Sequence, residues 1–378
     1  METLPAPSWC FILHSMGMFV THSQRGSVHH LLKKGEAMLR QIVSFVIIAG
    51  FVVSIGCKRA QLHLVDASVQ KPSNVAIYFT VADKAGEPVG GLTAEKFKIY
   101  EDGQLISEYE SQQTILNPEV ATIRYTLLLL DMSGSIVESG QTPLIQEASG
   151  VFITGVGEQE KVAIYAFDGR AELIEIADFE SSRGRLAGGK NRLSSWKSKD
   201  PSTNLNGAVV EASKILAETM ENSEVPIRFG TLVVFTDGTD RAHRATSGEA
   251  VSAIRNADIT AYVIGLGGEV DIEEMKRLGP DGVVHVQDQS SIVNAFSELA
   301  ERLHKLSQSY YLLSYCSPSR AGRHKLVVKA ILNEEETGTL GHEFDAEGFE
   351  PDCDPNDKPA FEVGMARPVN GAKGNARQ

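Results

Sequence analysis

The sequence LLLLDMSGS, residues 127–135, contains the two features that decide how this chain folds and where its site lies. Four consecutive leucines are typical of a strand that is covered on both faces, as strands in parallel sheets are. The strand ends in three oxygen-bearing side chains at alternate positions, those of Asp131, Ser133 and Ser135. Because alternate side chains can point toward one place, we expect these three residues to share a site.

Other segments predict an α/β domain around this strand. Long apolar runs, each typical of a buried strand, occur at residues 122–131, 161–168, 228–237 and 258–267. Stretches that we expect to be helical lie between or after them, at residues 142–154, 205–220, 247–256 and 290–306. Strands that alternate with helices indicate a Rossmann-like, doubly wound and mainly parallel sheet, which we expect to span residues 121–309.

Two segments that flank this domain have the pattern of β structure. In residues 73–120, NVAIYFTV alternates apolar and polar positions and EKFKIYEDGQLI indicates a hairpin; in residues 310–350, YYLLSY and HKLVVKAIL predict two strands. Each segment is too short to bury its own apolar face, so we expect the two to pair into a small β-sandwich-like unit. Residues 57–72 are polar and predict a tether, and residues 351–378 have few large apolar side chains and predict a disordered tail.

The overall charge limits the class of partner. The chain has 42% apolar and 22% charged residues, which is typical of a soluble globular protein, and its formal net charge is -13. Nucleic-acid binding needs a basic surface, so we expect no nucleic-acid partner.

The N-terminal part resembles an export signal. Residues 41–56 are uncharged and strongly apolar, Arg40 precedes them and Cys57 follows them. The sequence SIGC that ends this segment resembles the lipobox of bacterial lipoproteins, although Ser54 stands where Leu is commonest. The resemblance implies that Cys57 receives a lipid and becomes the first mature residue. It also implies a membrane-anchored protein of the bacterial cell envelope, facing the periplasm or the exterior.

The position of this segment suggests that translation starts at Met38. Residues 38–56 would then be the signal peptide, and residues 1–37 would be an untranslated or leader segment. Residues 33–37, KKGEA, can be encoded by a purine-rich stretch that resembles a bacterial ribosome-binding site. The alternative is a long basic leader before a single membrane helix.

The cysteines predict one disulfide. Of the four cysteines, Cys10 lies upstream of the expected start and Cys57 is the lipid candidate. Cys316 and Cys353 remain, and an exported chain rarely leaves two thiols free. We therefore expect these two residues to be joined.

A second carboxylate is expected beside the first. Asp237 ends the predicted strand at residues 228–237 as Asp131 ends its own, and ligands of open α/β sheets bind at the carboxyl ends of strands. Two carboxylates repel each other unless a cation or proton lies between them. Oxygen ligands suit Mg²⁺, with Mn²⁺ or Ca²⁺ as alternatives, and two carboxylates leave charge on the metal that an outside anion would quench.

The residues at these strand ends resemble the signature of a known family. Residues 131–135, DMSGS, are similar to the DxSxS signature of von Willebrand factor type A (VWA) domains, which in that family forms the metal-ion-dependent adhesion site. The family adds a Thr and a later Asp, which PSTNLNGAVVEA and FTDGTD place at Thr203 and Asp237. All five positions are filled in the family's order. The resemblance implies that the metal binds an Asp or Glu carboxylate of a partner protein.

Two other functions are compatible with parts of this sequence, a phosphatase and a structural component. A haloacid-dehalogenase-type phosphatase would use Asp131 with a second Asp two residues later, but that position is Ser133, so we expect no enzyme. A structural or assembly component of an envelope complex, with an incidental metal, remains the alternative to a binding module.

Two further carboxylates have two interpretations. Asp168 and Asp240 lie at or near predicted strand ends. They are either solvated loop residues or partners that orient metal-bound water.

Overall fold

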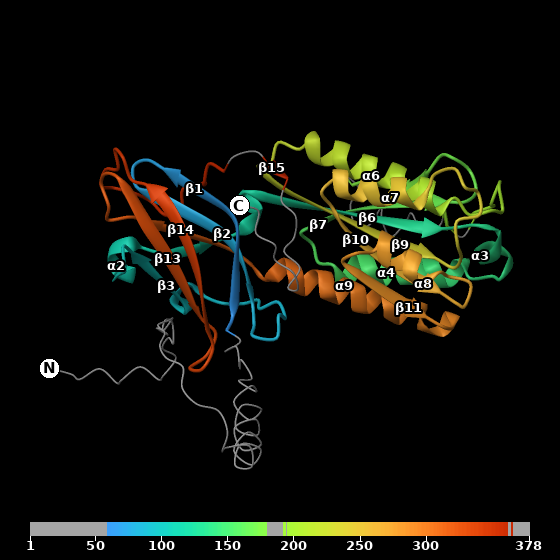
Figure 1. Ribbon diagram of the computed structural model, residues 1–378, viewed down its shortest axis with the longest axis horizontal. Coiled ribbons are helices and arrows are strands. Elements are labelled where there is room, and N and C mark those ends of the chain that lie inside the picture. The colour runs from blue at the N-terminus through green and yellow to red at the C-terminus, as the bar shows by residue number, and fades with distance from the viewer. Residues whose placement is uncertain (1–58, 180–191, 194, 362–363, 366–378) are drawn as a thin grey trace, which may run out of the picture. The chain divides into compact units, whose positions relative to one another are not determined.

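The computed structural model describes residues 59–179, 192–193, 195–361 and 364–365 of the chain (Figure 1). The expected signal peptide, the leader before it and Cys57 lie outside the described residues. Among the helices that are described, none has both the length and the apolar character needed to cross a membrane.

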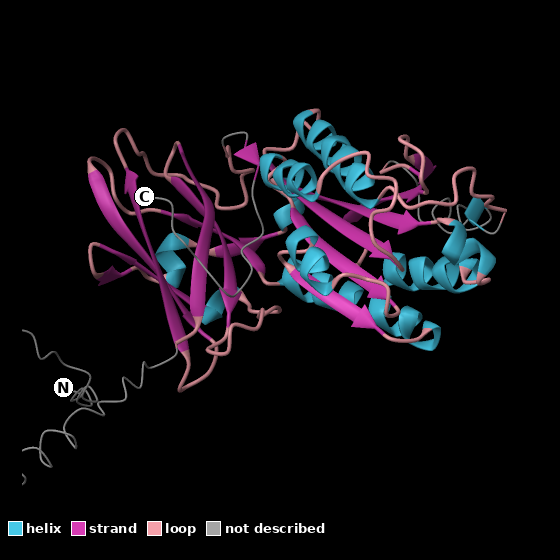
Figure 2. Cartoon of the chain, turned by 45° about the vertical axis from the view of Figure 1, so that its right-hand side comes forward, coloured by secondary structure: helices cyan, strands magenta, loops and turns pink. Residues whose placement is uncertain are grey.

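The α/β domain is built on a seven-stranded sheet (Figures 1 and 2). Six strands follow the order β11 (Gly282–Val286), β10 (Thr260–Leu266), β9 (Ile227–Thr236), β6 (Thr122–Asp131), β7 (Glu160–Phe167) and β8 (Ile174–Ala177). The first five are parallel to their neighbours and β8 is antiparallel to β7. The seventh, β15 (Gly364–Met365), pairs in parallel with the start of β9.

Helices cover both faces of this sheet, as Figure 2 shows. One buried cluster contains side chains of α4 (Thr142–Gly155) and α9 (Ile292–Gln308), and the other contains side chains of α6 (Leu205–Glu221), α7 (Ser247–Asn256) and α8 (Ile272–Leu278). Helix α7 begins at a capping box in which Thr246 and Glu249 each accept a hydrogen bond from the other's backbone. The predicted doubly wound fold is confirmed.

The strand order places a crevice between β6 and β9. Strand β7 follows β6 on one side through α4, and β9 lies on the other side of β6 after α6. Because α4 and α6 lie on opposite faces, the loops leaving β6 and β9 diverge at the carboxyl edge of the sheet. Asp131 ends β6, and Asp237 directly follows β9.

The flanking segments form a sandwich of two four-stranded sheets. One sheet has the order β1 (Gln61–Gln70), β2 (Asn74–Ala82), β12 (Tyr310–Cys316), β5 (Thr114–Leu116); the other has the order β14 (Thr337–Asp345), β13 (Arg323–Ile331), β3 (Phe97–Glu101), β4 (Gln104–Leu105). Their shared core contains Phe79, Phe97 and Tyr311. The predicted pairing of the two segments is confirmed, since β12 pairs with β2 and β13 pairs with β3.

Short helices complete the described elements. They are α2 (Glu108–Ser111), α3 (Gly134–Glu138) and the 3₁₀ turns Ala94–Lys96, Pro118–Val120 and Gln289–Ser291. Of these, α3 matters for the site, because it begins directly after the strand end that carries Asp131.

The predicted tether is wrong for most of its length, because Gln61–Gln70 forms β1. This strand is antiparallel to β2 along its whole length, with one irregularity between Leu64 and Asp66. It lies at the edge of its sheet, and eight of its ten side chains are partly buried or exposed. An edge strand can leave many side chains exposed because its backbone hydrogen bonds to the neighbouring strand hold it in place.

The predicted disordered tail is also wrong for residues 351–361. The expected disulfide between Cys316 and Cys353 is present, with a Cα–Cα distance of 5.7 Å. Beyond it, Gln70 accepts a hydrogen bond from the amide of Ala360 (3.0 Å), and Phe361 is buried. These contacts hold the segment in place although it has few large apolar side chains. Residues 366–378 lie outside the described part.

Candidate metal centre

The turn after β6 is organised by the carboxylate of Asp131, whose side chain is fully buried. One carboxylate oxygen accepts a hydrogen bond from the amide of Ser133 (3.0 Å), and the other accepts one from the hydroxyl of Thr236, the last residue of β9 (2.7 Å). Asp131 is therefore held in one orientation by donors from two neighbouring strand ends.

Two predicted hydroxyls connect this turn to the second carboxylate. The hydroxyl oxygens of Ser133 and Ser135 lie 3.2 Å apart, and the hydroxyl of Ser135 donates to Asp237 (3.0 Å). Asp131, Ser133, Ser135 and Asp237 thus form one continuous set of polar contacts. Four of the five residues that the sequence predicted to share a site are brought together by their side chains and the turn that carries them.

The fifth residue, Thr203, is joined to the site through its backbone. It is buried just before α6, and its carbonyl accepts hydrogen bonds from the amides of Arg241 (2.9 Å) and Ala242 (3.0 Å), in the loop after Asp237. On the other side, the amide of Gly134 donates to the carbonyl of Pro201 (3.0 Å). A Cβ on Gly134 would lie 2.7 Å from the Cβ of Pro201, so this close approach requires a glycine.

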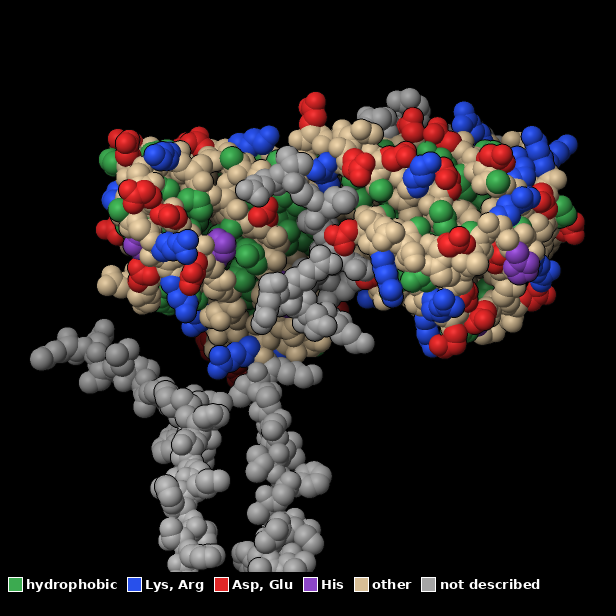
Figure 3. All heavy atoms as spheres, turned by 45° about the horizontal axis from the view of Figure 1, so that its top comes forward, with side chains coloured by type: hydrophobic (Ala, Val, Ile, Leu, Met, Phe, Trp, Pro, Cys, Tyr) green, Lys and Arg blue, Asp and Glu red, His purple; other side chains and the backbone are tan. Residues whose placement is uncertain are grey.

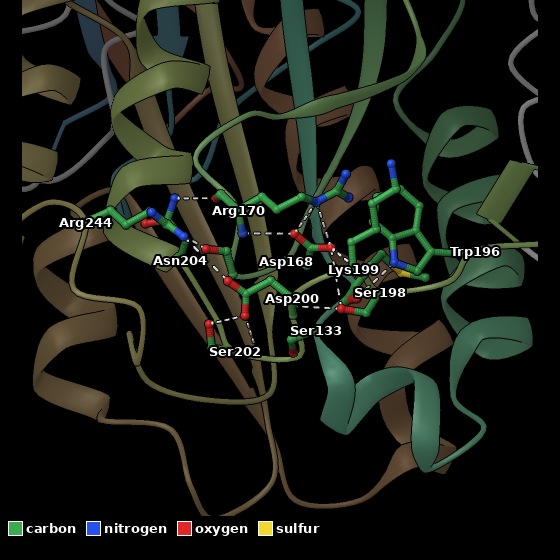
Figure 4. Close-up of polar contacts among 12 residues, drawn as sticks. Ser133, Asp168, Arg170, Trp196, Ser198, Lys199, Asp200, Ser202, Asn204 and Arg244 are labelled. Carbon is green, nitrogen blue, oxygen red and sulfur yellow. Dashed lines mark hydrogen bonds and ion pairs between the residues drawn. The ribbon is translucent and has the colours of Figure 1, made fainter.

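Asp168 is the anchor of the loop that carries Thr203 (Figure 4). Its side chain is fully buried and accepts hydrogen bonds from the amide of Arg170 (3.0 Å), the Nε of Arg170 (2.8 Å) and the amide of Lys199 (3.1 Å), while its carbonyl accepts from the amide of Asn204 (3.1 Å). Burial opposes ionisation, but the hydrogen bonds from Arg170 and Lys199 lower the pKa of Asp168. It is therefore not a solvated loop residue, and its carboxylate holds the loop through Arg170 and Lys199.

Arg244 links this loop to the loop that follows Asp237, as Figure 4 shows. Its Nε donates to the carbonyl of Gly169 (2.7 Å), and its Nη2 lies 3.5 Å from a carboxylate oxygen of Asp200. Asn204 adds a side-chain hydrogen bond to the carbonyl of Arg170 (2.8 Å). No local sequence pattern predicts these contacts, because they join loops that are far apart along the chain.

Asp240 has a separate structural role. Its carboxylate accepts hydrogen bonds from the amide of Asn206 (3.1 Å), in the first turn of α6, and from the amide of His243 (3.0 Å). The carboxylate therefore satisfies a free amide at the start of α6 and fixes the loop that follows β9.

The two carboxylates of the centre have raised pKa values, as expected where a cation would be favourable. Burial raises the pKa of Asp131 to about 7, with a further contribution from the nearby Asp237, while hydrogen bonds from Thr236 and Ser133 act in the opposite direction. Burial also raises the pKa of Asp237, against the hydrogen bond from Ser135. Among the described residues, no ion pair involves either carboxylate.

The donor atoms fit a hard divalent cation. They are carboxylate and hydroxyl oxygens, and within the described part of the chain no group of three or more His, Cys, Asp or Glu is placed to hold a metal ion. Such oxygen-only sets suit Mg²⁺ or Mn²⁺ better than metals that prefer nitrogen or sulfur. The residues that would hold the ion are Asp131, Ser133, Ser135, Thr203 and Asp237.

Comparisons with known proteins find similarity only among solved structures. No protein-family model and no curated protein sequence matches this chain. A von Willebrand factor type A protein from Catenulispora acidiphila is 13% identical, with a TM-score of 0.41, over 75% of this chain and 73% of that one. Manganese-loaded TRAP from Plasmodium vivax is 12% identical, with a TM-score of 0.41, over 66% of this chain and 98% of that one.

A third similar structure is proximal thread matrix protein 1 from the mussel byssus, with a zinc-occupied MIDAS motif. It is 17% identical, with a TM-score of 0.39, over 55% of this chain and 49% of that one, so the match spans about half the length of that protein. The interpretation of the present α/β domain as VWA-like rests on its own strand order and strand-end residues.

Proposed function

We propose that this chain is a protein-binding module that holds a carboxylate of a partner protein through a divalent cation. The proposal rests on the environment of the Asp131 carboxylate. This carboxylate is fully buried, its hydrogen bonds come from neutral donors, and a second carboxylate lies close enough to raise its pKa. A buried carboxylate without a positive partner is costly, and a bound cation would remove that cost.

The composition of the site explains why an outside ligand is expected. Five protein oxygens leave at least one position open on Mg²⁺, which prefers six ligands in octahedral geometry. Asp131 closes the inner side, whereas Ser135 is exposed and Asp237 is only partly buried. A partner can therefore approach from the side of Ser135 and Asp237, and the bound cation would supply the positive charge that attracts its Asp or Glu.

We propose Mg²⁺ as the cation, with Mn²⁺ and Ca²⁺ as alternatives, and a binding rather than an enzymatic role. The position two residues after Asp131 holds Ser133, which cannot act as the acid or base that a phosphatase of this type needs. The hydroxyl of Ser133 instead contacts that of Ser135 within the ligand set.

We also propose that the protein is exported and anchored to a membrane of the cell envelope through a lipid on Cys57. Two features support this proposal: the uncharged apolar segment at residues 41–56, and the disulfide between Cys316 and Cys353. Disulfides persist in oxidising compartments and are rare in the cytosol. Mass spectrometry of the N-terminal peptide tests it, and an unmodified peptide that continues upstream of Cys57 would contradict it.

The binding role is tested by capture of partners from membranes. Wild-type protein should retain a partner in Mg²⁺, lose it in EDTA and regain it when Mg²⁺ is restored, and Asp131→Ala should retain none. Asp345→Asn, which removes an exposed carboxylate of the sandwich, serves as the control and should behave as wild type. Partner retention that is indifferent to EDTA and to Asp131→Ala would favour the alternative, a structural or assembly component of an envelope complex with an incidental metal.

A further inference from the structure

The indole of Trp196 contacts the turn that carries two of the candidate metal ligands. Its Nε1 donates a hydrogen bond to the carbonyl of Met132 (3.0 Å), the residue between Asp131 and Ser133. The ring is partly buried and packs against the hydrophobic cluster that contains Met132 and Ile136. The turn is therefore held by a side chain that lies 64 positions away along the chain.

One peptide unit transmits this contact to the carboxylate of Asp131. The carbonyl of Met132 and the amide of Ser133 belong to the same planar unit, and in a trans peptide they point in opposite directions. The carbonyl accepts from the indole, and the amide donates to Asp131 (3.0 Å). The indole thus fixes the plane of the peptide that orients the carboxylate, and the two hydrogen bonds in series strengthen each other.

Both backbone polar groups of Met132 are used by this arrangement. Its amide donates to the carbonyl of Phe167, the last residue of β7 (2.8 Å), and its carbonyl accepts from the indole. Met132 is fully buried, so removal of the indole N–H would leave a buried carbonyl without this donor. Because unpaired buried acceptors are costly, the turn would then shift toward another donor and lose its alignment with the ligand set.

The ring is ordered by the loops that also hold Asp168. The guanidinium of Arg170 lies 5.7 Å from the ring centroid of Trp196, as Figure 4 shows for the two side chains, and its Nε donates to Asp168 (2.8 Å). The attraction of a cation to an aromatic face favours this arrangement. The amide of Trp196 donates to the carbonyl of Leu193 (3.0 Å), which is buried. The protein's own contacts therefore direct the indole N–H at the turn.

We propose that Trp196 is a positioning residue of the metal centre, which raises cation affinity by holding the peptide between Met132 and Ser133. The proposal rests on the proposed function, because it concerns the same site. Linked equilibria are reciprocal, so a bound cation strengthens the docking of the indole by the same factor. The segment that carries Trp196 also contacts the turn through Pro201, whose carbonyl accepts from Gly134 (3.0 Å). Displacement of this segment therefore weakens the site, and occupancy of the site holds the segment in place.

The test uses the full chain with Trp9→Phe, in which Trp196 is the only tryptophan. Trp196 is then replaced during expression by benzothienylalanine, in which a sulfur stands in place of the N–H while the shape of the ring is kept. Calorimetric titration should give an Mg²⁺ affinity about fivefold weaker, which corresponds to ~1 kcal/mol. The control Tyr311→Phe removes a buried donor of the sandwich, which bonds the carbonyl of Val89 (2.9 Å), and should leave the affinity unchanged.

The emission of Trp196 separates a positioning role from a purely structural one. In the Trp9→Phe protein, Mg²⁺ should reduce the quenching of this emission by acrylamide, over the same concentrations at which calorimetry detects binding. Asp131→Ala in the same background should show no such change. Acrylamide is the quencher because it is uncharged, so the acidic and basic side chains interspersed on the surface in Figure 3 do not concentrate it.

The outcomes separate the inference from the proposed function. An Mg²⁺ affinity that benzothienylalanine leaves unchanged, or quenching that Mg²⁺ does not alter, would overturn the positioning role and leave the metal-dependent function in place. A loss of affinity in Tyr311→Phe as large as that with benzothienylalanine would also overturn it. If the Trp9→Phe protein binds no Mg²⁺, the proposed function itself fails and the inference fails with it.

Discussion

Arg124 and Asp131 are charged residues near the two ends of the same strand, β6, and the protein surrounds them in opposite ways. The guanidinium of Arg124 lies 4.4 Å from the ring centroid of Tyr310 and 4.7 Å from that of Phe229, and it donates to the hydroxyl of Tyr78 (3.2 Å). Burial lowers the pKa of Arg124, but Tyr78, Tyr310 and Glu160 more than offset this effect and raise it. This charge is compensated by the protein's own side chains.

Within the described part of the chain, Asp131 has no such compensation. Its hydrogen bonds come from an amide and a hydroxyl, and Asp237 adds like charge, so its pKa is raised to about 7. A structural charge is compensated by neighbouring side chains of the protein, whereas a functional charge is left for a ligand to compensate. Arg124 stabilises the junction between β6, β9 and the strands β2 and β12 of the sandwich, whereas no basic side chain among the described residues pairs with Asp131.

We expect the largest change in the free energy of unfolding from substitution of Arg124. Replacing Arg124 with Met removes the contacts with two rings and with Tyr78, and we expect a loss of about 2–3 kcal/mol in the free energy of unfolding. Urea denaturation measures it. Arg124→Lys should recover only part, since an ammonium lacks the planar donor fork. A change below ~0.5 kcal/mol would contradict a structural role for this charge.

At Asp131 we expect a substitution that removes the charge to stabilise the fold. A carboxyl whose folded pKa is raised above its ordinary value of about 4 destabilises the fold as pH rises through that interval, and the full cost is present above the folded pKa. In EDTA, Asp131→Asn should therefore be more stable than wild type by about 1–2 kcal/mol at pH 8 and nearly equal to it at pH 4. Urea denaturation at the two pH values decides this. Lower stability of the variant at pH 8 would show that the buried charge is compensated after all.

Asp168 is a compensated charge that should act on the metal through Thr203. We expect Asp168→Asn to weaken Mg²⁺ binding about tenfold, or ~1.4 kcal/mol, because it loosens the loop held by Arg170 and Lys199. Added to Thr203→Ala, the same change should have almost no further effect on affinity, because the ligand that the loop positions is already gone. Additive losses in this double-mutant cycle would contradict a positioning role, and Glu301→Gln should leave Mg²⁺ binding unchanged.

The smallest effect is expected at His324, a compensated charge on the sandwich. Its two ring nitrogens contact the carbonyl of Ala321 (2.9 Å) and the carboxylate of Asp102 (2.8 Å), both acceptors, and these contacts raise its pKa. The stabilisation should be complete below the ordinary histidine pKa and should disappear as pH rises through the raised one. Wild type should thus exceed His324→Gln in stability more at pH 5.5 than at pH 8.5, and a gap that widens with pH would contradict this.

Much of this organisation could be predicted from the sequence. The apolar strands and the helices between them define the α/β order, and Asp131 and Asp237 follow two strands that turn out to be neighbours. The pairing of the flanking segments follows from their exposed apolar faces. Helix α8 is not among the predicted helices, although Asp271, which accepts hydrogen bonds from the amides of Glu273 and Glu274, is a recognisable N-terminal cap.

Other parts depend on contacts that leave no local pattern. Strand β1 has no continuous apolar run and is fixed by pairing with β2, and the segment around Ala360 is fixed by Gln70, which is far away in the sequence. The role of Asp168 depends on amides of residues that are distant along the chain, such as Lys199. Backbone hydrogen bonds carry no side-chain signature, so these features could not be read from residue types alone.

The most direct test of the uncompensated charge at Asp131 is a calorimetric titration of wild type and Asp131→Ala with Mg²⁺, repeated with Mn²⁺. Wild type should bind one cation per chain, and Asp131→Ala should show no saturable binding, because it lacks the carboxylate at the centre of the ligand set. Ser133→Ala should bind more weakly than wild type but retain affinity, since it loses only a neutral oxygen. Equal affinities of wild type and Asp131→Ala would contradict the account.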